Sequence, residues 1–323
     1  MEALRKVMGT QKASTSMKFS ELVERWKAMQ VPAMKLSTVN HYQHALRAIT
    51  PVFGLVEVAT ITRHDVEQFV QDRARKYSRS SLHSFRTTLS LVLGYAVSNG
   101  WIEKNPVIGL RLPRAENCGG DAITRCKLTS EQVVALAESL DEPFSTLVLS
   151  LASTGLRIGE AAGLRWSDLQ NNVLHVQRRI YYGKQDDLKT KGSNRKLPLP
   201  DALVSRLLKL KKGDTWIFQA SNGAALNPGN WLRREVRPAA KKLGIGLTGW
   251  HDFRHYFTHQ LRRRKTHPKV LSGMLGHSGV TLAMEDYDYN ELVDFQGSMS
   301  EMLHDVMKSE VPASNLSTVY TVW

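Results

Sequence analysis

The chain has 323 residues, enough for two ordinary domains, and its hydrophobic fraction of 42% is typical of a folded protein. Its two cysteines, Cys118 and Cys126, imply no disulfide framework, and without a signal-peptide core or a run of about eighteen apolar residues we expect a cytoplasmic protein with no membrane span. The 44 Lys and Arg residues against 30 Asp and Glu give a net charge of +14, which favours a polyanionic partner, DNA or RNA first.

The positive charge is unevenly distributed along the chain. Residues 1–127 carry a net charge of +9, residues 128–284 carry +12, and residues 285–323 carry −7. Two basic units followed by an acidic tail are suited to hold one nucleic-acid duplex between them. Counting leaves the alternative open that the basic residues form an ordinary solvated surface.

The pattern of the first third predicts a compact domain of about four helices. Apolar residues recur at helical spacing from Phe19, and a second helix is predicted to begin near Ser37, a candidate N-cap. Thr62 and Asp65 predict a capping box at the start of a third helix. The fourth helix is predicted to end at Gly100, in the left-handed conformation common at helix C-termini.

The pattern changes after a Pro- and Gly-containing segment at residues 111–127, which predicts a linker. Thr129 and Gln132 predict a capping box, and the apolar stretch FSTLVLSLAS predicts a further helix. Alternation between residues 173 and 200 predicts a β-hairpin in a small antiparallel sheet, and helical patterns resume after Asn227. The predicted fold class is therefore mainly α with a small antiparallel β-sheet.

Three short motifs contain residues suited to phosphoryl transfer: TGLRIGEAAGLRWSDL (154–169), HDFRHYFTHQL (251–261) and LGHSGVTLAMEDYDY (275–289). Arginine forks match the oxygens of a phosphate, and imidazoles move protons near neutral pH. A tyrosine hydroxyl can act as the nucleophile once a neighbouring group activates it. The candidates are two arginines, two histidines and one tyrosine: Arg157, Arg254, His251, His277 and Tyr287.

These motifs, in this order and spacing, resemble the tyrosine recombinase (phage integrase) family, and residues 17–110 resemble its helical core-binding (SAM-like) domain. The resemblance implies a two-domain DNA clamp, in which residues 111–127 link the core-binding domain to a catalytic domain at 128–310. Members of the family cut each DNA strand with a tyrosine. The products are a 3′-phosphotyrosine and a free 5′-hydroxyl, and a second 5′-hydroxyl then reseals the strand.

The resemblance also implies roles for individual residues. Arg157 and Arg254 match the family arginines that stabilise the pentavalent phosphate, and His251 matches the histidine that assists proton transfer from the nucleophile. His277 matches a position that hydrogen-bonds a nonbridging oxygen. Glu160 matches an acidic position that supports the site without performing the chemistry.

The general acid of the family is a lysine on a β-hairpin. Here the corresponding stretch reads DDLKTKGSNRKLPLP, which contains Lys189 and Lys191. The KT pairing and the distance to LPLP favour Lys189, whereas a slip of one residue in the turn would favour Lys191.

Tyr287 is the predicted nucleophile because it lies ten residues after His277, the usual family distance, whereas Tyr289 lies twelve residues after it. Residues two apart on a helix point to nearly opposite sides, so only one of the two tyrosines can face the site. The family often has a histidine two residues after the nucleophile, where this chain has Tyr289.

A metal site is the sharpest alternative for the second motif. His251, His255 and His259 recur at i, i+4 and i+8 on one predicted helix face, a spacing that zinc sites use. Arg254 shares that face and would repel a dication, and Asp252 is the only acidic residue among them. We therefore expect no metal and no other cofactor, since a phosphotyrosine stores the bond energy.

The resulting hypothesis is a site-specific DNA recombinase that integrates or excises a mobile element. It is expected to act on double-stranded DNA as a tetramer, associated with the nucleoid if the source is bacterial. Accessory DNA-bending or directionality factors are further candidate partners. The alternatives are a type IB topoisomerase, which shares the chemistry, and a DNA-binding regulator that has lost activity, against which the complete set of site residues argues.

The two ends of the chain carry expectations of their own. Residues 1–16 are polar and aperiodic, so we expect them to be disordered. The segment after the predicted nucleophile has an apolar stripe with acidic neighbours, and the tail at 311–323 is apolar and β-prone. Docking of this C-terminal region on a neighbouring subunit and packing on its own domain are both compatible with the pattern.

Overall fold

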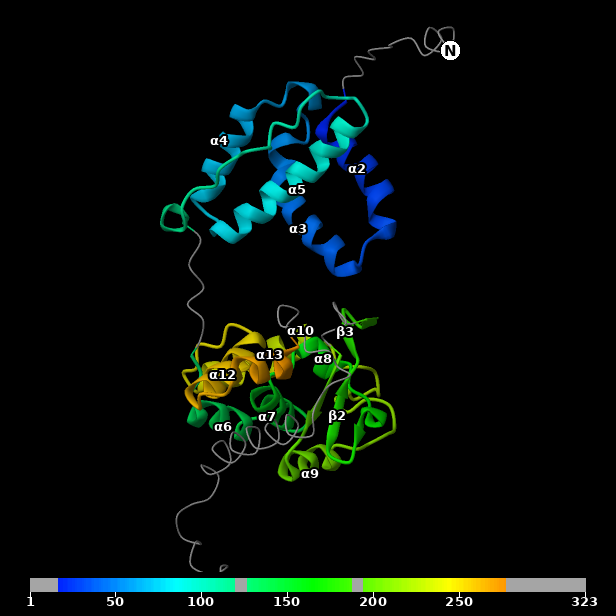
Figure 1. Ribbon diagram of the computed structural model, residues 1–323, viewed down its shortest axis with the longest axis vertical. Helices are drawn as coiled ribbons and strands as arrows, with labels where there is room; N and C mark the ends of the chain where they lie inside the picture. Colours follow the sequence, from blue (N-terminus) through cyan, green and yellow to red (C-terminus); the bar gives the residue numbers. More distant parts are fainter. Residues whose placement is uncertain (1–16, 120–126, 188–193, 277–323) are drawn as a thin grey trace, which may run out of the picture. The chain divides into compact units, whose positions relative to one another are not determined.

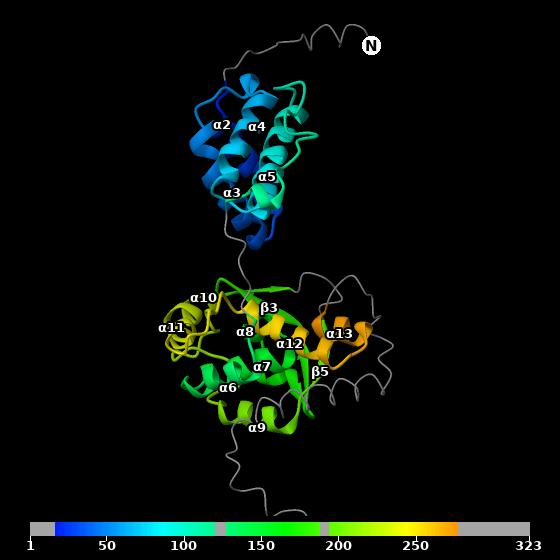
Figure 2. The same ribbon diagram turned by 90° about the vertical axis from the view of Figure 1, so that its left-hand side faces the viewer.

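The computed structural model describes residues 17–119, 127–187 and 194–276. The chain divides into two compact units, residues 1–124 and 125–323 (Figures 1 and 2). The predicted disordered segment at 1–16 and the predicted tail at 311–323 lie outside the described residues. Within the described part of the chain, no helix is long and apolar enough to cross a lipid bilayer.

Four aromatic side chains, one from each long helix, form the core of the N-terminal unit. The helices are α2 (Phe19–Gln30), α3 (Leu36–Phe53), α4 (Arg63–Ala74) and α5 (Arg79–Ser98), with 3-10 turns at Val31–Ala33, Val58–Thr60 and Ala115–Asn117. The ring centroids of Phe19 and Phe53 lie 5.9 Å apart, those of Phe53 and Phe69 5.4 Å, and those of Phe69 and Phe85 6.4 Å. Such tilted or edge-on contacts add about 0.5 to 1.5 kcal/mol each to the burial of the rings.

The predicted ends of these helices can be compared with the structure one by one. The capping box of α4 is confirmed, because Thr62 N donates to Asp65 Oδ2 over 2.8 Å and Asp65 N donates to Thr62 Oγ1 over 3.2 Å. Gly100 has a φ of +71°, as predicted for the residue that ends α5. The prediction of Ser37 as an N-cap is wrong. The 3-10 turn before α3 leaves only a short extended segment, so Lys35 takes the N-cap position and Ser37 lies in the first turn.

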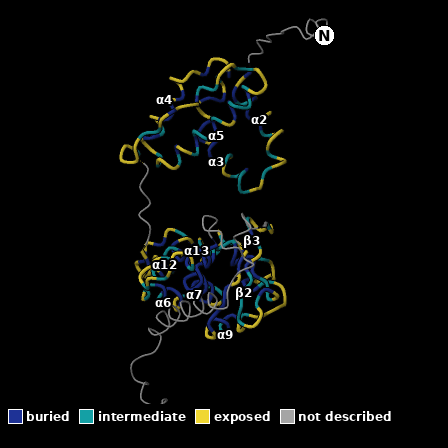
Figure 3. Tube along the Cα trace, in the orientation of Figure 1, coloured by how far each residue is buried: buried dark blue, intermediate teal, exposed yellow. Residues whose placement is uncertain are grey.

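The C-terminal unit is built around α7, which is buried along almost its whole length (Figure 3). Its residues are apolar or carry small hydroxyl groups, and Ser150, Ser153 and Thr154 donate these hydroxyls to carbonyls within the helix. It packs against α6, α8, α9 and α12. The helices of the unit within the described residues are α6 (Ser130–Glu138), α7 (Phe144–Thr154), α8 (Ile158–Ala162), α9 (Asp201–Lys209), α10 (Pro228–Trp231), α11 (Arg237–Lys242), α12 (His251–Arg263) and α13 (Pro268–Leu275), with a 3-10 turn at Trp166–Asp168 and a π-helical turn at Leu232–Val236.

Two predicted helix starts of this unit are confirmed, those of α6 and α10, whereas α9 was not predicted, because helix was expected to resume only after Asn227. Thr129 and Gln132 form the capping box of α6, with Gln132 N donating to Thr129 Oγ1 over 3.2 Å and Thr129 N donating to Gln132 Oε1 over 3.1 Å. Asn227 caps α10 by accepting a hydrogen bond from Asn230 N over 3.2 Å. Thr129 and Asn227 are both favoured N-cap residues, and Pro228 after Asn227 is common at the first position of a helix.

The strands form two small antiparallel sheets rather than the single predicted hairpin. The three-stranded sheet has the order β1 (Leu169–Gln170), β2 (Val173–Val176), β5 (Arg195–Pro198), and the hairpin pairs β3 (Arg178–Tyr181) with β4 (Lys184–Asp187). The chain leaves the first sheet at Gln177, where Gln177 Nε2 and Arg178 Nη1 both donate to Asp168. Tyr182 and Gly183 then close the hairpin with φ angles of +49° and +74°, the conformation of a tight two-residue turn.

The turn between α7 and α8 requires glycine at position 155. Gly155 has a φ of +64°, and a Cβ added there would lie 2.4 Å from Cδ1 of Phe257 on α12. Gly183 has a similar φ but open space around it. Substitution at Gly183 therefore introduces backbone strain alone, whereas substitution at Gly155 adds steric overlap.

We predict that Gly155→Ala lowers the free energy of unfolding by about 3 kcal/mol, because a left-handed backbone costs roughly 1 to 2 kcal/mol and overpacking adds a similar amount. Gly183→Ala should cost only the backbone part. Urea unfolding of the two variants beside the wild type measures the difference. Equal losses would contradict the proposed overlap with Phe257.

Candidate active site

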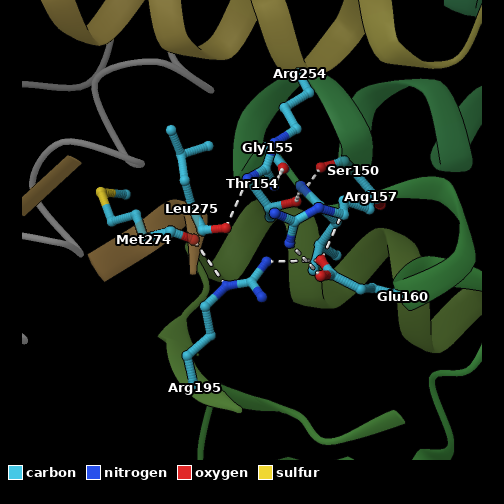
Figure 4. Close-up of polar contacts among 10 residues, drawn as sticks. Ser150, Thr154, Gly155, Arg157, Glu160, Arg195, Arg254, Met274 and Leu275 are labelled. Atoms are coloured by element: carbon cyan, nitrogen blue, oxygen red, sulfur yellow. Dashed lines mark hydrogen bonds and ion pairs between the residues drawn. The ribbon is translucent and has the colours of Figure 1, made fainter. Parts of the chain in front are cut away.

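Arg157 lies at the junction of α7 and α8, where the chain turns sharply (Figure 4). Gly155 ends α7 in the left-handed conformation, and Arg157 is the N-cap residue of α8 with an extended backbone. Its side chain is 37% exposed. The turn therefore holds a guanidinium group at a helix N-terminus, a place that itself favours anions.

Glu160 fixes the position of Arg157 through both of its carboxylate oxygens. Arg157 N donates to Oε2 over 3.0 Å, and Arg157 Nη1 donates to Oε1 over 2.8 Å. The carboxylate is only 2% exposed. A buried carboxylate that holds both the backbone and the side chain of Arg157 restricts the direction in which this guanidinium can point.

Arg195, the first residue of β5, supplies the second cation against Glu160. Its Nη2 donates to Glu160 Oε2 over 2.8 Å, and its Nε donates to the carbonyl oxygen of Met274 over 2.8 Å. The side chain is 1% exposed. Arg195 therefore joins α8, β5 and the last turn of α13 inside the unit (Figure 4).

Arg254 contributes a third guanidinium from the first turn of α12. Its Nη1 donates to the carbonyl oxygen of Gly155 and its Nη2 to that of Leu275, each over 2.6 Å. Asp252, in the same turn, holds the chain before the helix by accepting from Thr248 N over 2.6 Å and from Gly249 N over 3.0 Å. The helix is thus anchored at the turn that carries Arg254.

The charges of the cluster act on one another strongly. Burial alone would raise the pKa of Glu160, but the adjacent Arg195 and Arg157 outweigh it and lower that pKa to about 2. Burial and the nearby Arg157 lower the pKa of Arg254 to about 9, against the opposing effect of Glu160. Arg254 is therefore protonated at neutral pH. Within the described residues, three guanidinium groups surround one carboxylate, and two of them form ion pairs with it. A phosphate group is suited to such a cluster.

The structure brings three of the predicted site residues together: Arg157, Glu160 and Arg254. His251 is the exposed first residue of α12, and its ring meets that of His255 edge-on with 5.2 Å between centroids. The remaining predicted residues lie outside the described part of the chain: Lys189, Lys191, His277, Tyr287 and Tyr289.

Arg195 is a site residue that the motif analysis missed. The spacing in β5 could have indicated its burial. Arg195 and Leu197 are two residues apart in a strand, so their side chains point to the same face, and Leu197 is fully buried. An arginine on the apolar face of a strand requires a buried partner, and Glu160 is the acidic residue at the site.

The three-histidine alternative can be compared with the described residues. Among them, no group of three or more His, Cys, Asp or Glu side chains is arranged to hold a metal ion. His251, His255 and His259 all lie on α12, within the described range.

Comparison with known proteins assigns the chain to a family. The model of the phage integrase family matches residues 127–291, and that of the phage integrase central domain matches residues 19–112. The chain belongs to the phage integrase family of tyrosine recombinases. This confirms the resemblance seen in the motifs, and with it the coarse enzyme class, since tyrosine recombinases cleave and rejoin DNA.

Individual relatives are distant but similar over most of their length. A tyrosine recombinase XerC-like protein of Caldanaerobacter subterraneus is 24% identical over 306 residues, which cover 83% of this chain and 77% of the relative. The integrase of Escherichia phage lambda is 21% identical over 281 residues, covering 81% and 73%.

Solved structures of similar fold come from the same family. The Tn1549 transposon integrase in complex with a circular intermediate DNA has a TM-score of 0.70 at 19% identity, covering 87% of this chain and 95% of that one. A lambda integrase tetramer bound to a Holliday junction has a TM-score of 0.67 at 20% identity, covering 87% and 86%. The predicted fold class, mainly α with small antiparallel sheets, is confirmed.

The lowered pKa of Glu160 makes a prediction about acid stability. A carboxyl whose folded pKa lies below its ordinary value of 4.5 stabilises the protein fully above pH 4.5 and loses that contribution as the pH falls toward about 2. The contribution is about 3 kcal/mol. Glu160→Gln should therefore be less stable than the wild type by about that amount at neutral pH, and the difference should shrink steadily on acidification.

Urea unfolding at a series of pH values measures this difference. Glu138→Gln is the matched control, because Glu138 is exposed at the end of α6 and its substitution should change little at any pH. A stability difference for Glu160→Gln that stays constant from neutral pH to about pH 3 would contradict the assignment of charge to the buried carboxyl.

Proposed function

We propose that this protein is a site-specific recombinase that integrates or excises a mobile element, cutting and rejoining DNA through a 3′-phosphotyrosine. The observation that carries the proposal is the cluster of Arg157, Arg195 and Arg254 around Glu160 in a member of the phage integrase family. Relatives named as integrases of phages and of a transposon support the mobile-element setting. The DNA complexes of those relatives support double-stranded DNA as the substrate.

Arg157 and Arg254 act on the scissile phosphate. Charge accumulates on the nonbridging oxygens as the tyrosine oxygen attacks, and guanidinium groups held in advance stabilise that charge without reorganising. Arg157 is the more exposed of the two family arginines and contacts the phosphate, while Arg254 adds charge from the buried side of the site. His251, three residues before Arg254 on the same helix, assists proton transfer from the nucleophile.

The remaining steps are carried out by residues whose roles follow from the sequence motifs. Tyr287 is the nucleophile, His277 donates to a nonbridging oxygen, and Lys189, or Lys191 if the turn is shifted, protonates the leaving 5′-oxygen. Attack by Tyr287 exchanges one phosphodiester for another of similar energy, so resealing requires no nucleotide. The arginine charges supply the electrostatic stabilisation that a metal ion would otherwise provide.

We also propose that the two units form a DNA clamp and that four chains assemble on the DNA. Residues 17–110 would be the core-binding domain and residues 128–310 the catalytic domain, joined by a linker at 111–127. The division of the chain between residues 124 and 125 and the matches at 19–112 and 127–291 support these boundaries. The tetramer formed by the lambda integrase on a Holliday junction supports the assembly.

The nucleophile can be tested by comparing two tyrosine variants. Tyr287→Phe removes the attacking oxygen, so we predict that it abolishes covalent attachment to a nicked duplex from the junctions flanking its gene, while DNA binding persists. Tyr289→Phe is the matched control and should retain attachment. A denaturing gel resolves the protein–DNA adduct, and attachment by Tyr287→Phe but not by Tyr289→Phe would reverse the assignment.

The absence of a metal requirement is a separate prediction. If arginines carry the electrostatic stabilisation, strand cleavage by the wild type should proceed at an unchanged rate after dialysis against excess EDTA. Circular dichroism before and after dialysis shows whether the chain stays folded. Loss of cleavage from a folded chain would contradict the assignment of this stabilisation to the arginines alone.

A further inference from the structure

Arg195 differs from the other arginines of the site in what it joins. Its Nε binds a carbonyl 79 residues away in sequence, and its Nη2 binds a carboxylate 35 residues away. The side chain is 1% exposed, so it is not placed to meet DNA. Arg195 contacts Glu160, the residue that holds Arg157. Because Arg195 is buried, it cannot contact the phosphate as we propose for Arg157.

We propose that Arg195 is a positioning residue of the recombination reaction, which sets the orientation of Arg157 through Glu160 and ties that pair to the last turn of α13. The inference rests on the proposed function and adds to it a residue for which the family motifs provide no role in this chain. Arg195 does not act on the phosphate itself.

The shape of the guanidinium group explains why an arginine stands at this position. Two N–H groups that point in different directions reach Glu160 Oε2 and the Met274 carbonyl at the same time, each over 2.8 Å. A lysine ammonium at the end of a flexible chain is a point charge, so it can neutralise Glu160 but does not fix both partners in one plane. Replacing Arg195 with lysine therefore keeps the positive charge and removes the geometry of the guanidinium group.

Glu160 connects Arg195 to Arg157, and the charged groups around it determine whether it is ionised. Arg157 from the start of α8, Arg195 from β5 and Arg254 from α12 are the charged side chains that act with it. The neighbouring strand β3 carries Arg178 and Arg179, each of which is paired with an aspartate of its own. Burial opposes ionisation of Glu160, and Arg195 is the strongest of the groups that favour it.

Removing Arg195 should therefore change the pH dependence of catalysis as well as its rate. Without that cation, burial raises the pKa of Glu160 toward the neutral range. As the pH falls through the raised value, Glu160 becomes protonated and Arg157 loses its anionic partner. In the wild type the same carboxyl stays ionised down to about pH 2, so it causes no such loss.

The experiment measures single-turnover formation of the covalent adduct on a nicked junction duplex from about pH 5 to pH 8. Arg195→Met should cut the rate by about 100-fold, as expected for a misplaced catalytic group, and add an acidic limb to the profile. Arg195→Lys should remove the acidic limb but not restore the wild-type rate. The double variant Glu160→Gln/Arg195→Met should be slow at every pH and show no limb, because neither partner is charged.

Arg178→Met is the matched control for loss of a buried pair. Asp168 is 3% exposed and is bound by Arg178, so this variant also leaves a buried carboxylate without its arginine. We expect it to lose stability but to keep the wild-type pH profile. An acidic limb of the same size in this control would show that the limb reports general destabilisation, and the inference would be wrong.

The outcomes separate this inference from the proposed function. If the wild type forms the adduct and Arg195→Met matches it in rate and profile, Arg195 does not position the site, although the function stands. If Arg195→Met fails to fold, the double variant decides, because a neutral pair of similar volume is tolerated in place of a buried ion pair. A wild type that forms no adduct overturns the proposed function and this inference with it.

Discussion

The buried carboxylate of Glu160 is the constraint on which the site depends. A carboxylate inside a protein needs charged partners, because its desolvation is costly. Here two arginines supply them, one from the start of α8 and one from β5. The same pairing that keeps Glu160 ionised orients Arg157. One group thus meets a requirement of folding and the requirement of catalysis that we propose.

The surrounding fold makes that pairing possible. The helix α7 is buried along almost its whole length and is followed by Gly155, which turns the chain so that Arg157 and Glu160 come at the start of α8. Arg254 binds the carbonyl of Gly155, so α12 is fastened to the same turn. The turn therefore holds two arginines from distant parts of the chain, and a side chain at position 155 would overlap Phe257 on α12, the helix that carries Arg254.

Local signals predicted the helices well, because capping depends on residues a few positions apart, as for Thr62 and Thr129. The motifs singled out Arg157 and Arg254, and in the structure the charge of Arg157 acts on Arg254. The prediction of strand pairing was wrong because pairing depends on residues far apart in sequence. Strand β2 pairs with β5, and a backbone turn at Tyr182 closes a separate hairpin of β3 and β4. Arg195 was missed for a related reason. Arginines are mostly exposed, and only the tertiary partner Glu160 explains why this one is not.

The partners of the buried arginines also explain how the site stays positive. Arg195 and Arg254 satisfy much of their hydrogen-bonding capacity with the carbonyls of Met274, Leu275 and Gly155, which lie at the C-terminal ends of α13 and α7. Helix C-termini carry only partial negative charge. Such carbonyls hold guanidinium groups without cancelling them, whereas a carboxylate for each arginine would neutralise the cluster. Within the described residues, three guanidinium groups thus share one full carboxylate and several helix ends. A phosphate diester is a partner suited to such a cluster.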